Sequence, residues 1–206
     1  MNPILDIKTS GKPLDQAEKA LIMIHGRGGS AKDILGLSEH LNVKDYALLA
    51  PQATNGSWYP FSFIAPAEQN EPWLSSAIET VEKTVTKVLD AGINAEHIYF
   101  FGFSQGACLT LEFLARNAQK FGGAAAIIGG VIGEKINRGN YKGDFAGMPV
   151  LLATSNPDFH VPVERVYATA NILKEINADV TEKVYENFGH SINQEEIELA
   201  NKIIFR

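Results

Sequence analysis

The sequence lacks several features that would otherwise define its setting. It contains a single cysteine, Cys108, so no internal disulfide can form. The first residues lack the basic start and apolar run of a signal peptide, and no stretch reaches the roughly 18 uninterrupted apolar residues of a membrane-spanning helix. Lys and Arg form no cluster longer than a pair and the formal net charge is −6, which argues against nucleic acid or an anionic membrane as the main partner. We therefore expect a cytoplasmic protein that acts on a small molecule.

The composition that is present is that of an ordinary globular protein. Hydrophobic residues make up 45% of the chain and charged residues 20%. With 206 residues the chain can bury a core without metal ions or disulfides, so we predict one domain over residues 1–206. Nothing in the composition requires a cofactor or a metal ion, and nothing in it sets an oligomeric state.

Short apolar runs alternate with longer amphipathic segments along the chain. This alternation is typical of a mostly parallel sheet with helices on both faces. Several of the predicted strands are nearly continuous in apolar residues, as strands buried on both faces are. They are residues 20–24, 46–50, 98–102, 123–128, 150–155 and 180–185, with an edge strand at 4–8. The predicted helices are residues 31–41, 73–91, 105–118, 162–176 and 194–205.

Two segments fit neither pattern. Residues 51–72 form a long stretch rich in proline and aromatic side chains, among them Trp58, Tyr59 and Phe61. Loops of this length are usually functional in compact domains, so we expect this one to fold over a site. Residues 129–147 are rich in glycine and predict an excursion between two strands rather than a linker between domains.

A serine stands where a predicted strand turns into a predicted helix. The stretch Gly102-Phe103-Ser104-Gln105-Gly106 ends the apolar strand and opens the next helix. Such a turn forces the serine into a strained backbone conformation, and the flanking glycines remove side chains that would collide there. We therefore predict that Ser104 is an exposed nucleophile rather than only a helix cap. The backbone N–H of Gln105, at a helix N-terminus, is predicted to donate to an oxyanion.

The base that activates Ser104 has to be one of the five histidines. Three of them are expected to be structural or surface residues: His25, His40 and His97. His190 follows the last predicted strand, and the loops at the carboxyl ends of parallel strands gather at one edge of the sheet. His190 is therefore predicted as the general base. His160 is expected at the rim, in contact with substrate.

The carboxylate that orients His190 should lie between the serine and the histidine in the chain. Among the acidic residues there, only Asp158 directly follows a predicted core strand. Asp158 is predicted to accept the second ring proton of His190 and to stabilise the imidazolium. The alternative is an aspartate that only forms a turn in Asn156-Pro157-Asp158, because turns favour these residues.

A glycine-rich loop, His25-Gly26-Arg27-Gly28-Gly29-Ser30, follows the first predicted core strand. It has neither the lysine ending of a phosphate-binding loop nor the glycine spacing of a dinucleotide-binding loop. We predict instead that the backbone N–H of Arg27 is the second oxyanion donor. The Arg27 side chain is expected to lie in solvent, with pairing to an anionic group of the substrate as the alternative.

In their order and spacing, these motifs resemble the phospholipase/carboxylesterase family of α/β-hydrolases, which includes the acyl-protein thioesterases. The likeness extends from residue 20 to residue 205 and rests on Ile24-His25-Gly26, Trp58-Tyr59, the serine motif, Asp158 with Val161-Pro162, and Gly189-His190-Ser191-Ile192. The resemblance implies an α/β-hydrolase fold with a minimal cap, no cofactor, and an aromatic acyl pocket near Trp58 and Tyr59. We add Phe61 and His160 as substrate contacts. Arg27 departs from the family, which usually has a neutral residue there.

Together these features predict a serine hydrolase that cleaves ester or thioester bonds of small to medium acyl groups through an acyl-enzyme. One alternative is a catalytically silent member of the same fold that binds a small ligand or a partner. Another is a lactonase of the dienelactone hydrolase type. Those enzymes resemble this fold but have a cysteine nucleophile, which is absent here. The least favoured alternative is a metal hydrolase built on His25, His160 and Asp158, because the sequence has no paired-histidine helix motif to accompany them.

Overall fold

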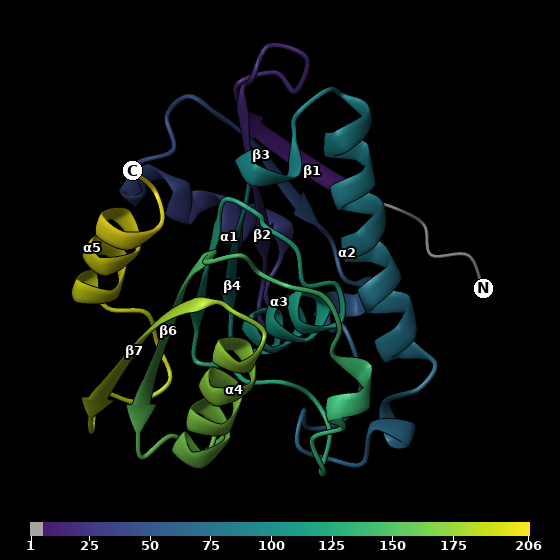
Figure 1. Ribbon diagram of the computed structural model, residues 1–206, viewed down its shortest axis with the longest axis vertical. Helices are drawn as coiled ribbons and strands as arrows, with labels where there is room; N and C mark the ends of the chain where they lie inside the picture. Colours follow the sequence, from purple (N-terminus) through teal and green to yellow (C-terminus); the bar gives the residue numbers. More distant parts are fainter. Residues whose placement is uncertain (1–5) are drawn as a thin grey trace.

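The computed structural model describes residues 6–206 and is built around one twisted sheet (Figure 1). Its strands are β1 (Ile7–Gly11), β2 (Lys19–Ile24), β3 (Tyr46–Pro51), β4 (Ile98–Phe103), β5 (Gly123–Ile127), β6 (Pro149–Asn156) and β7 (Asp179–Glu186). They lie in the order β1-β3-β2-β4-β5-β6-β7. β1 is antiparallel to β3, and all other neighbouring pairs are parallel. The inner strands are buried, as their continuous apolar runs predict.

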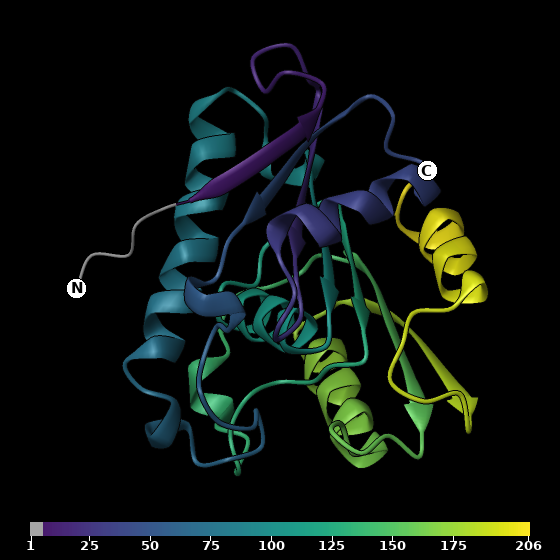
Figure 2. The same ribbon diagram turned by 180° about the vertical axis from the view of Figure 1, so that it is seen from behind.

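Helices cover both faces of the sheet (Figures 1 and 2). They are α1 (Ala31–Gly36), α2 (Trp73–Asp90), α3 (Gln105–Arg116), α4 (Val163–Glu175) and α5 (Gln194–Ile203). α1 connects β2 to β3, towards the β1 edge of the sheet, whereas the connections that contain α2, α3 and α4 lead towards the β7 edge. Because crossovers between parallel strands are right-handed, α1 lies on the opposite face of the sheet from these three helices. α5 lies beside the end of the 3₁₀ turn that follows α1, where the Asn201 side chain is hydrogen-bonded to the backbone of His40 and Asn42.

The structure confirms the predicted alternation of strands and helices, with differences at two places. The predicted edge strand at 4–8 is found as β1, at Ile7–Gly11, while residues 4 and 5 lie outside the described residues. Most of β1 is exposed, so it has no apolar run that a sequence pattern could show. The predicted helix at 31–41 ends as an α-helix at Gly36 and continues as a 3₁₀ turn, Leu37–His40.

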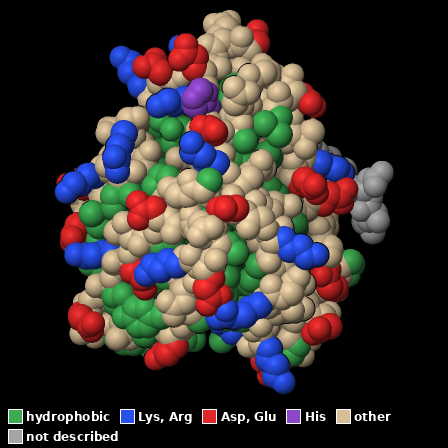
Figure 3. Space-filling view, viewed as in Figure 1, with side chains coloured by type: hydrophobic (Ala, Val, Ile, Leu, Met, Phe, Trp, Pro, Cys, Tyr) green, Lys and Arg blue, Asp and Glu red, His purple; other side chains and the backbone are tan. Residues whose placement is uncertain are grey.

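The surface seen in Figure 3 carries charged side chains of both signs, with Lys and Arg spread among Asp and Glu rather than gathered in one patch. This mixture agrees with a formal net charge of only −6. No helix within residues 6–206 is long and apolar enough to cross a lipid bilayer.

The loops that carry the predicted site residues lie at one edge of the sheet. β2, β4, β6 and β7 are parallel, so the loops after them emerge at the same edge. In chain order these loops carry Arg27, Ser104, Asp158 and His190. The sheet therefore brings these residues together from distant parts of the sequence.

Candidate active site

Ser104 lies at the turn from β4 to α3 in a backbone conformation that few residues adopt, with φ +53° and ψ −119°. A Cβ on Gly106 would lie 2.1 Å from the Ile24 carbonyl oxygen, and one on Gly102 would lie 2.7 Å from the Gly106 carbonyl oxygen. Close backbone packing therefore requires both glycines, as predicted. The Ser104 side chain makes no capping hydrogen bond to α3, so a simple capping role does not account for it.

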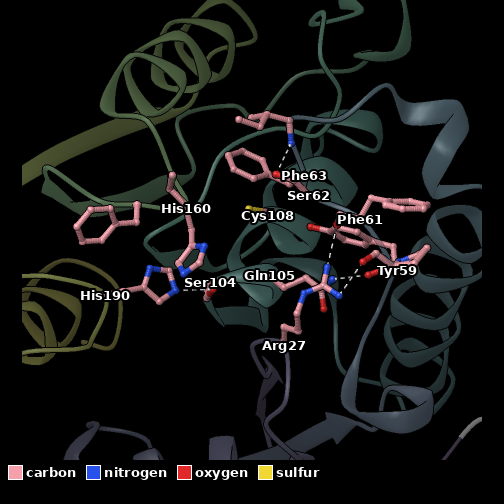
Figure 4. Close-up of a pocket in the computed structure, with 14 residues that line it drawn as sticks. Arg27, Tyr59, Phe61, Ser62, Phe63, Ser104, Gln105, Cys108, His160 and His190 are labelled. Atoms are coloured by element: carbon pink, nitrogen blue, oxygen red, sulfur yellow. Dashed lines mark hydrogen bonds between the residues drawn. The ribbon is translucent and has the colours of Figure 1, made fainter.

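The Ser104 hydroxyl faces His190 across the edge of the sheet (Figure 4). Ser104 Oγ lies 2.7 Å from His190 Nε2, and His190 Nδ1 lies 2.8 Å from Asp158 Oδ2. The structure thus joins in one hydrogen-bonded chain the three residues that the sequence analysis selected as a group.

The carboxylate of Asp158 is fully buried and is hydrogen-bonded through both of its oxygens. Its Oδ1 accepts the backbone N–H groups of His160 and Val161, each at 2.8 Å. Burial acts to raise the pKa of Asp158, but these N–H groups and His190 outweigh it and hold the pKa below its usual value. An ionised carboxylate only accepts, so His190 Nδ1 carries the ring proton and Nε2 is left to accept the proton of the Ser104 hydroxyl.

The remaining histidines lie outside this chain of hydrogen bonds. The His160 ring packs edge-on against the His190 ring, with centroids 5.0 Å apart and planes at 75°. His25 is buried, with Nδ1 2.7 Å from the Gly26 carbonyl and Nε2 3.2 Å from the Ala53 amide. Two more are exposed: His40 and His97. No group of three or more His, Cys, Asp or Glu side chains in residues 6–206 is arranged to hold a metal ion, so the arrangement of His25, His160 and Asp158 is not observed.

Two backbone N–H groups near Ser104 lack a protein acceptor. A Cβ on Gly26 would lie 3.3 Å from the Ser104 Cβ, so the loop after β2 packs directly against the serine. Within residues 6–206, no acceptor is hydrogen-bonded to the backbone N–H of Arg27 or of Gln105, whereas the N–H groups of Gly28 and Gly29 are both paired. Unpaired N–H groups beside a serine hydroxyl are suited to binding a developing oxyanion.

The aromatic loop, residues 52–72, is fastened to the serine turn by Gln105. Gln105 Oε1 accepts the Trp58 amide N–H at 3.0 Å, and Gln105 Nε2 donates to the Tyr59 carbonyl at 2.8 Å. The Trp58 indole N–H donates to the His25 carbonyl at 2.8 Å, and the ring packs against His25. Trp58, which we expected in the acyl pocket, is therefore turned away from the cavity and anchors the loop instead.

A cavity of about 600 Å³ opens above Ser104, a volume within the usual range for small-molecule sites. Tyr59, Phe61 and His160 line it, in agreement with their predicted places. The full lining is Arg27, Tyr59, Pro60, Phe61, Ser62, Phe63, Ile64, Ser104, Gln105, Cys108, Phe159, His160, Val161 and His190 (Figure 4). Phe159 is 97% exposed, so it stands at the mouth of the cavity rather than in its wall.

The Arg27 side chain differs from the expectation of a solvated arginine. Its Nη1 donates to Ser57 Oγ at 2.9 Å and to the Pro60 carbonyl at 3.0 Å, and its Nη2 donates to the Phe61 carbonyl at 2.8 Å. The residue is exposed, yet its guanidinium is held against the loop. It lines the cavity in this fixed position.

The sequence analysis missed Ser155, which shapes the site from behind. The buried Ser155 Oγ accepts the N–H groups of Phe188 at 3.1 Å and Gly189 at 2.9 Å, which fixes the loop that carries His190. Its position at the end of a core strand, three residues before Asp158, was the available signal. The buried Cys108 also lines the cavity. Burial raises its pKa to about 12, so the thiol stays protonated and is a poor nucleophile.

Comparison with known proteins assigns the chain to a family. The sequence profile of the phospholipase/carboxylesterase family matches residues 7–205. The crystal structure of a phospholipase/carboxylesterase from Dyadobacter fermentans has 51% sequence identity and a TM-score of 0.97, with 98% of this chain and 97% of that chain covered.

Two relatives in other organisms are more distant. A probable carboxylesterase of Arabidopsis thaliana, SOBER1-like, is 27% identical over 199 residues, which cover 88% of this chain and 76% of the relative. Acyl-protein thioesterase 1 of Saccharomyces cerevisiae is 26% identical over 215 residues, which cover 90% and 91%. The chain belongs to the phospholipase/carboxylesterase family of α/β-hydrolases.

Proposed function

We propose that the chain is a serine hydrolase that cleaves carboxylic ester or thioester bonds of small to medium acyl groups through an acyl-enzyme on Ser104. The observation that carries the proposal is the hydrogen-bonded chain from Ser104 through His190 to Asp158, with distances of 2.7 and 2.8 Å. The relatives named carboxylesterase and acyl-protein thioesterase support the choice of ester or thioester substrates.

In the first half of the reaction, Ser104 Oγ attacks the carbonyl carbon of the substrate while His190 Nε2 takes the hydroxyl proton. The carbonyl oxygen becomes an oxyanion, which the backbone N–H groups of Arg27 and Gln105 stabilise. Asp158 holds His190 in the required tautomer and stabilises the imidazolium. When the tetrahedral intermediate breaks down, the alcohol or thiol leaves with the proton from His190, and the acyl group remains on Ser104.

In the second half, a water molecule replaces the leaving group beside His190. His190 Nε2 takes a proton from this water as the water oxygen attacks the acyl carbon. The second tetrahedral intermediate collapses, the carboxylic acid is released, and Ser104 regains its proton from His190. Apart from the substrate and this water molecule, the proposed steps use only the side chains and backbone of the chain itself.

The proposal is tested by screening the purified protein against p-nitrophenyl esters of graded acyl length and against acyl-thioesters. We expect hydrolysis of short and medium acyl groups, and a loss of at least about a thousandfold in kcat for Ser104→Ala. Circular dichroism and the melting temperature of Ser104→Ala should match those of the wild type, since the loss is chemical. Hydrolysis at the wild-type rate by Ser104→Ala would contradict the proposal.

Two expectations from the sequence stay predictions. One is that residues 1–206 form a single domain, and the other is that the protein is cytoplasmic. The proposed reaction uses a small-molecule ester or thioester and involves no nucleic acid.

A further inference from the structure

The charge of the cavity is set by one residue. Among the residues that line it, Arg27 is the only one with a permanent charge, and no Asp or Glu side chain lines it. Asp158, the nearest acidic residue of the site, has a fully buried side chain behind His190. A substrate in this cavity therefore meets a positive charge with no negative charge in the lining to offset it.

The guanidinium of Arg27 keeps part of its donor capacity. It has five N–H groups, and three donate to the Ser57 hydroxyl and to the carbonyls of Pro60 and Phe61. In residues 6–206 no acceptor pairs with Nε–H or with the second N–H of Nη2. These contacts fix the plane of the group in advance, so less side-chain entropy is lost when a ligand binds. Nε–H and Nη2–H can bind both oxygens of one carboxylate.

The position of Arg27 determines which part of the substrate its side chain can bind. His190 gives its proton to the leaving group, so the leaving group must lie beside His190. Figure 4 shows His190 and His160 on one side of Ser104, with Arg27 and Tyr59 on the other. Because Arg27 lies on the side of Ser104 away from His190, its side chain is placed to meet the acyl part of the substrate rather than the leaving group.

We propose that Arg27 makes the protein selective for esters or thioesters whose acyl group ends in a carboxylate, such as monoesters of short dicarboxylic acids. This inference rests on the proposed function and adds a substrate class to it. The carboxylate is bound by the free edge of the guanidinium while Ser104 attacks the carbonyl at the other end of the acyl chain. The neutral walls formed by Tyr59, Phe63 and Cys108 accommodate the methylene groups between.

The experiment compares two substrates that differ only in charge. p-Nitrophenyl monoesters of succinic, glutaric and adipic acid are each paired with the methyl ester of their free carboxyl group, and spontaneous hydrolysis is subtracted. We expect the wild type to have a higher kcat/KM for at least one acid than for its neutral partner, by about ten- to a hundredfold. Added salt should lower this preference, because Arg27 is exposed and its attraction is screened.

Variants separate recognition of the carboxylate from support of the loop. Arg27→Met should reduce the acid-to-neutral ratio of kcat/KM to about one, and Arg27→Lys should keep part of it. Ser57→Ala is the matched control, because it removes one loop contact of Arg27 and leaves the charge in place. Its activity on both substrates should fall together, with the ratio unchanged.

Three results would overturn the inference while the proposed function stands, and the first two concern the ratio itself. One is a wild-type ratio of one or less with the neutral esters still cleaved, and the other is a ratio that Arg27→Met leaves unchanged. An equal fall of the ratio in Arg27→Met and Ser57→Ala would also overturn it, since Arg27 would then act only through the loop. If the wild type cleaves neither kind of ester, the proposed function itself fails.

Discussion

The two sides of the cavity are built by different means. On the triad side, Ser104, Asp158 and His190 lie in the loops after β4, β6 and β7, and close backbone packing at Gly102 and Gly106 fixes the turn of Ser104. On the loop side, residues 57–61 belong to no long helix or strand and are held by the side chains of Arg27 and Gln105. The sheet therefore determines the chemistry, and a few side-chain hydrogen bonds determine the shape of the substrate site. Substitutions on the triad side should lower kcat for every substrate, whereas the effect of substitutions on the loop side should differ from one substrate to another.

The largest effect is expected on the triad side, where substitution of His190 and substitution of the neighbouring His160 should have very different effects on kcat. His190→Ala should lower kcat by about a thousandfold or more, because it removes the group bonded to both Ser104 and Asp158. His160→Ala should mainly raise KM, because the His160 ring only packs against His190 and lines the cavity. Both variants are measured on one activated ester. An inactive His160→Ala with a mildly affected His190→Ala would show that the base is wrongly assigned.

A smaller effect should follow from loosening the loop side without touching the triad. Gln105→Met keeps about the same side-chain volume and the backbone N–H of residue 105, but removes the hydrogen bonds to Trp58 and Tyr59. Two lost hydrogen bonds of about 1 kcal/mol each predict a KM about ten- to thirtyfold higher with a smaller change in kcat. Steady-state kinetics on a neutral ester measures both. Unchanged kinetics would mean that the loop holds its position without Gln105.

The smallest effect concerns stability on the triad side, where α5 follows the loop that carries His190. Glu196 is buried and accepts the Asn193 N–H in a capping box. Burial raises its pKa to about 7, with the Asn193 N–H opposing and Glu195 adding to the shift. The folded state thus binds this proton more tightly than the unfolded state does. The contribution to stability is present below about pH 4.5 and is lost as the pH rises through 7.

Glu196→Gln stays neutral and keeps an oxygen that accepts the Asn193 N–H. We expect it to be more stable than the wild type at pH 8, by about 2 kcal/mol, with the difference vanishing below about pH 4.5. Denaturant unfolding across this pH range measures it. Glu198→Gln is the control, because Glu198 is exposed and does not contribute to the pKa shift of Glu196, so its pH profile should match that of the wild type. Parallel pH profiles for Glu196→Gln and the wild type would contradict the assignment.

The same contrast explains what the sequence could predict. Ser104, Asp158 and His190 were found because each follows a predicted strand, and parallel strands place the loops after them at one edge. Local sequence is enough for this, since strand length and turn residues determine where each side chain emerges. Even the requirement for Gly102 and Gly106 could be foreseen, because a sharp turn leaves no room for side chains.

Side-chain contacts on the loop side could not be foreseen in the same way. Trp58 was expected to line the cavity, but an aromatic residue in a long loop can turn to either side. Its hydrogen bond to the His25 carbonyl holds the ring away from the cavity. Arg27 was expected in solvent, and its acceptors lie in a loop thirty or more residues away. Such contacts depend on how two irregular segments meet, and no sequence pattern records that.

The most direct test of the central claim, that Ser104 is a nucleophile activated by His190, is covalent labelling with a fluorophosphonate followed by mass spectrometry. We expect one adduct per chain, located on Ser104, absent in Ser104→Ala and formed far more slowly in His190→Ala. The buried, protonated Cys108 should carry none. An adduct on another residue, or undiminished labelling of Ser104→Ala, would contradict the account.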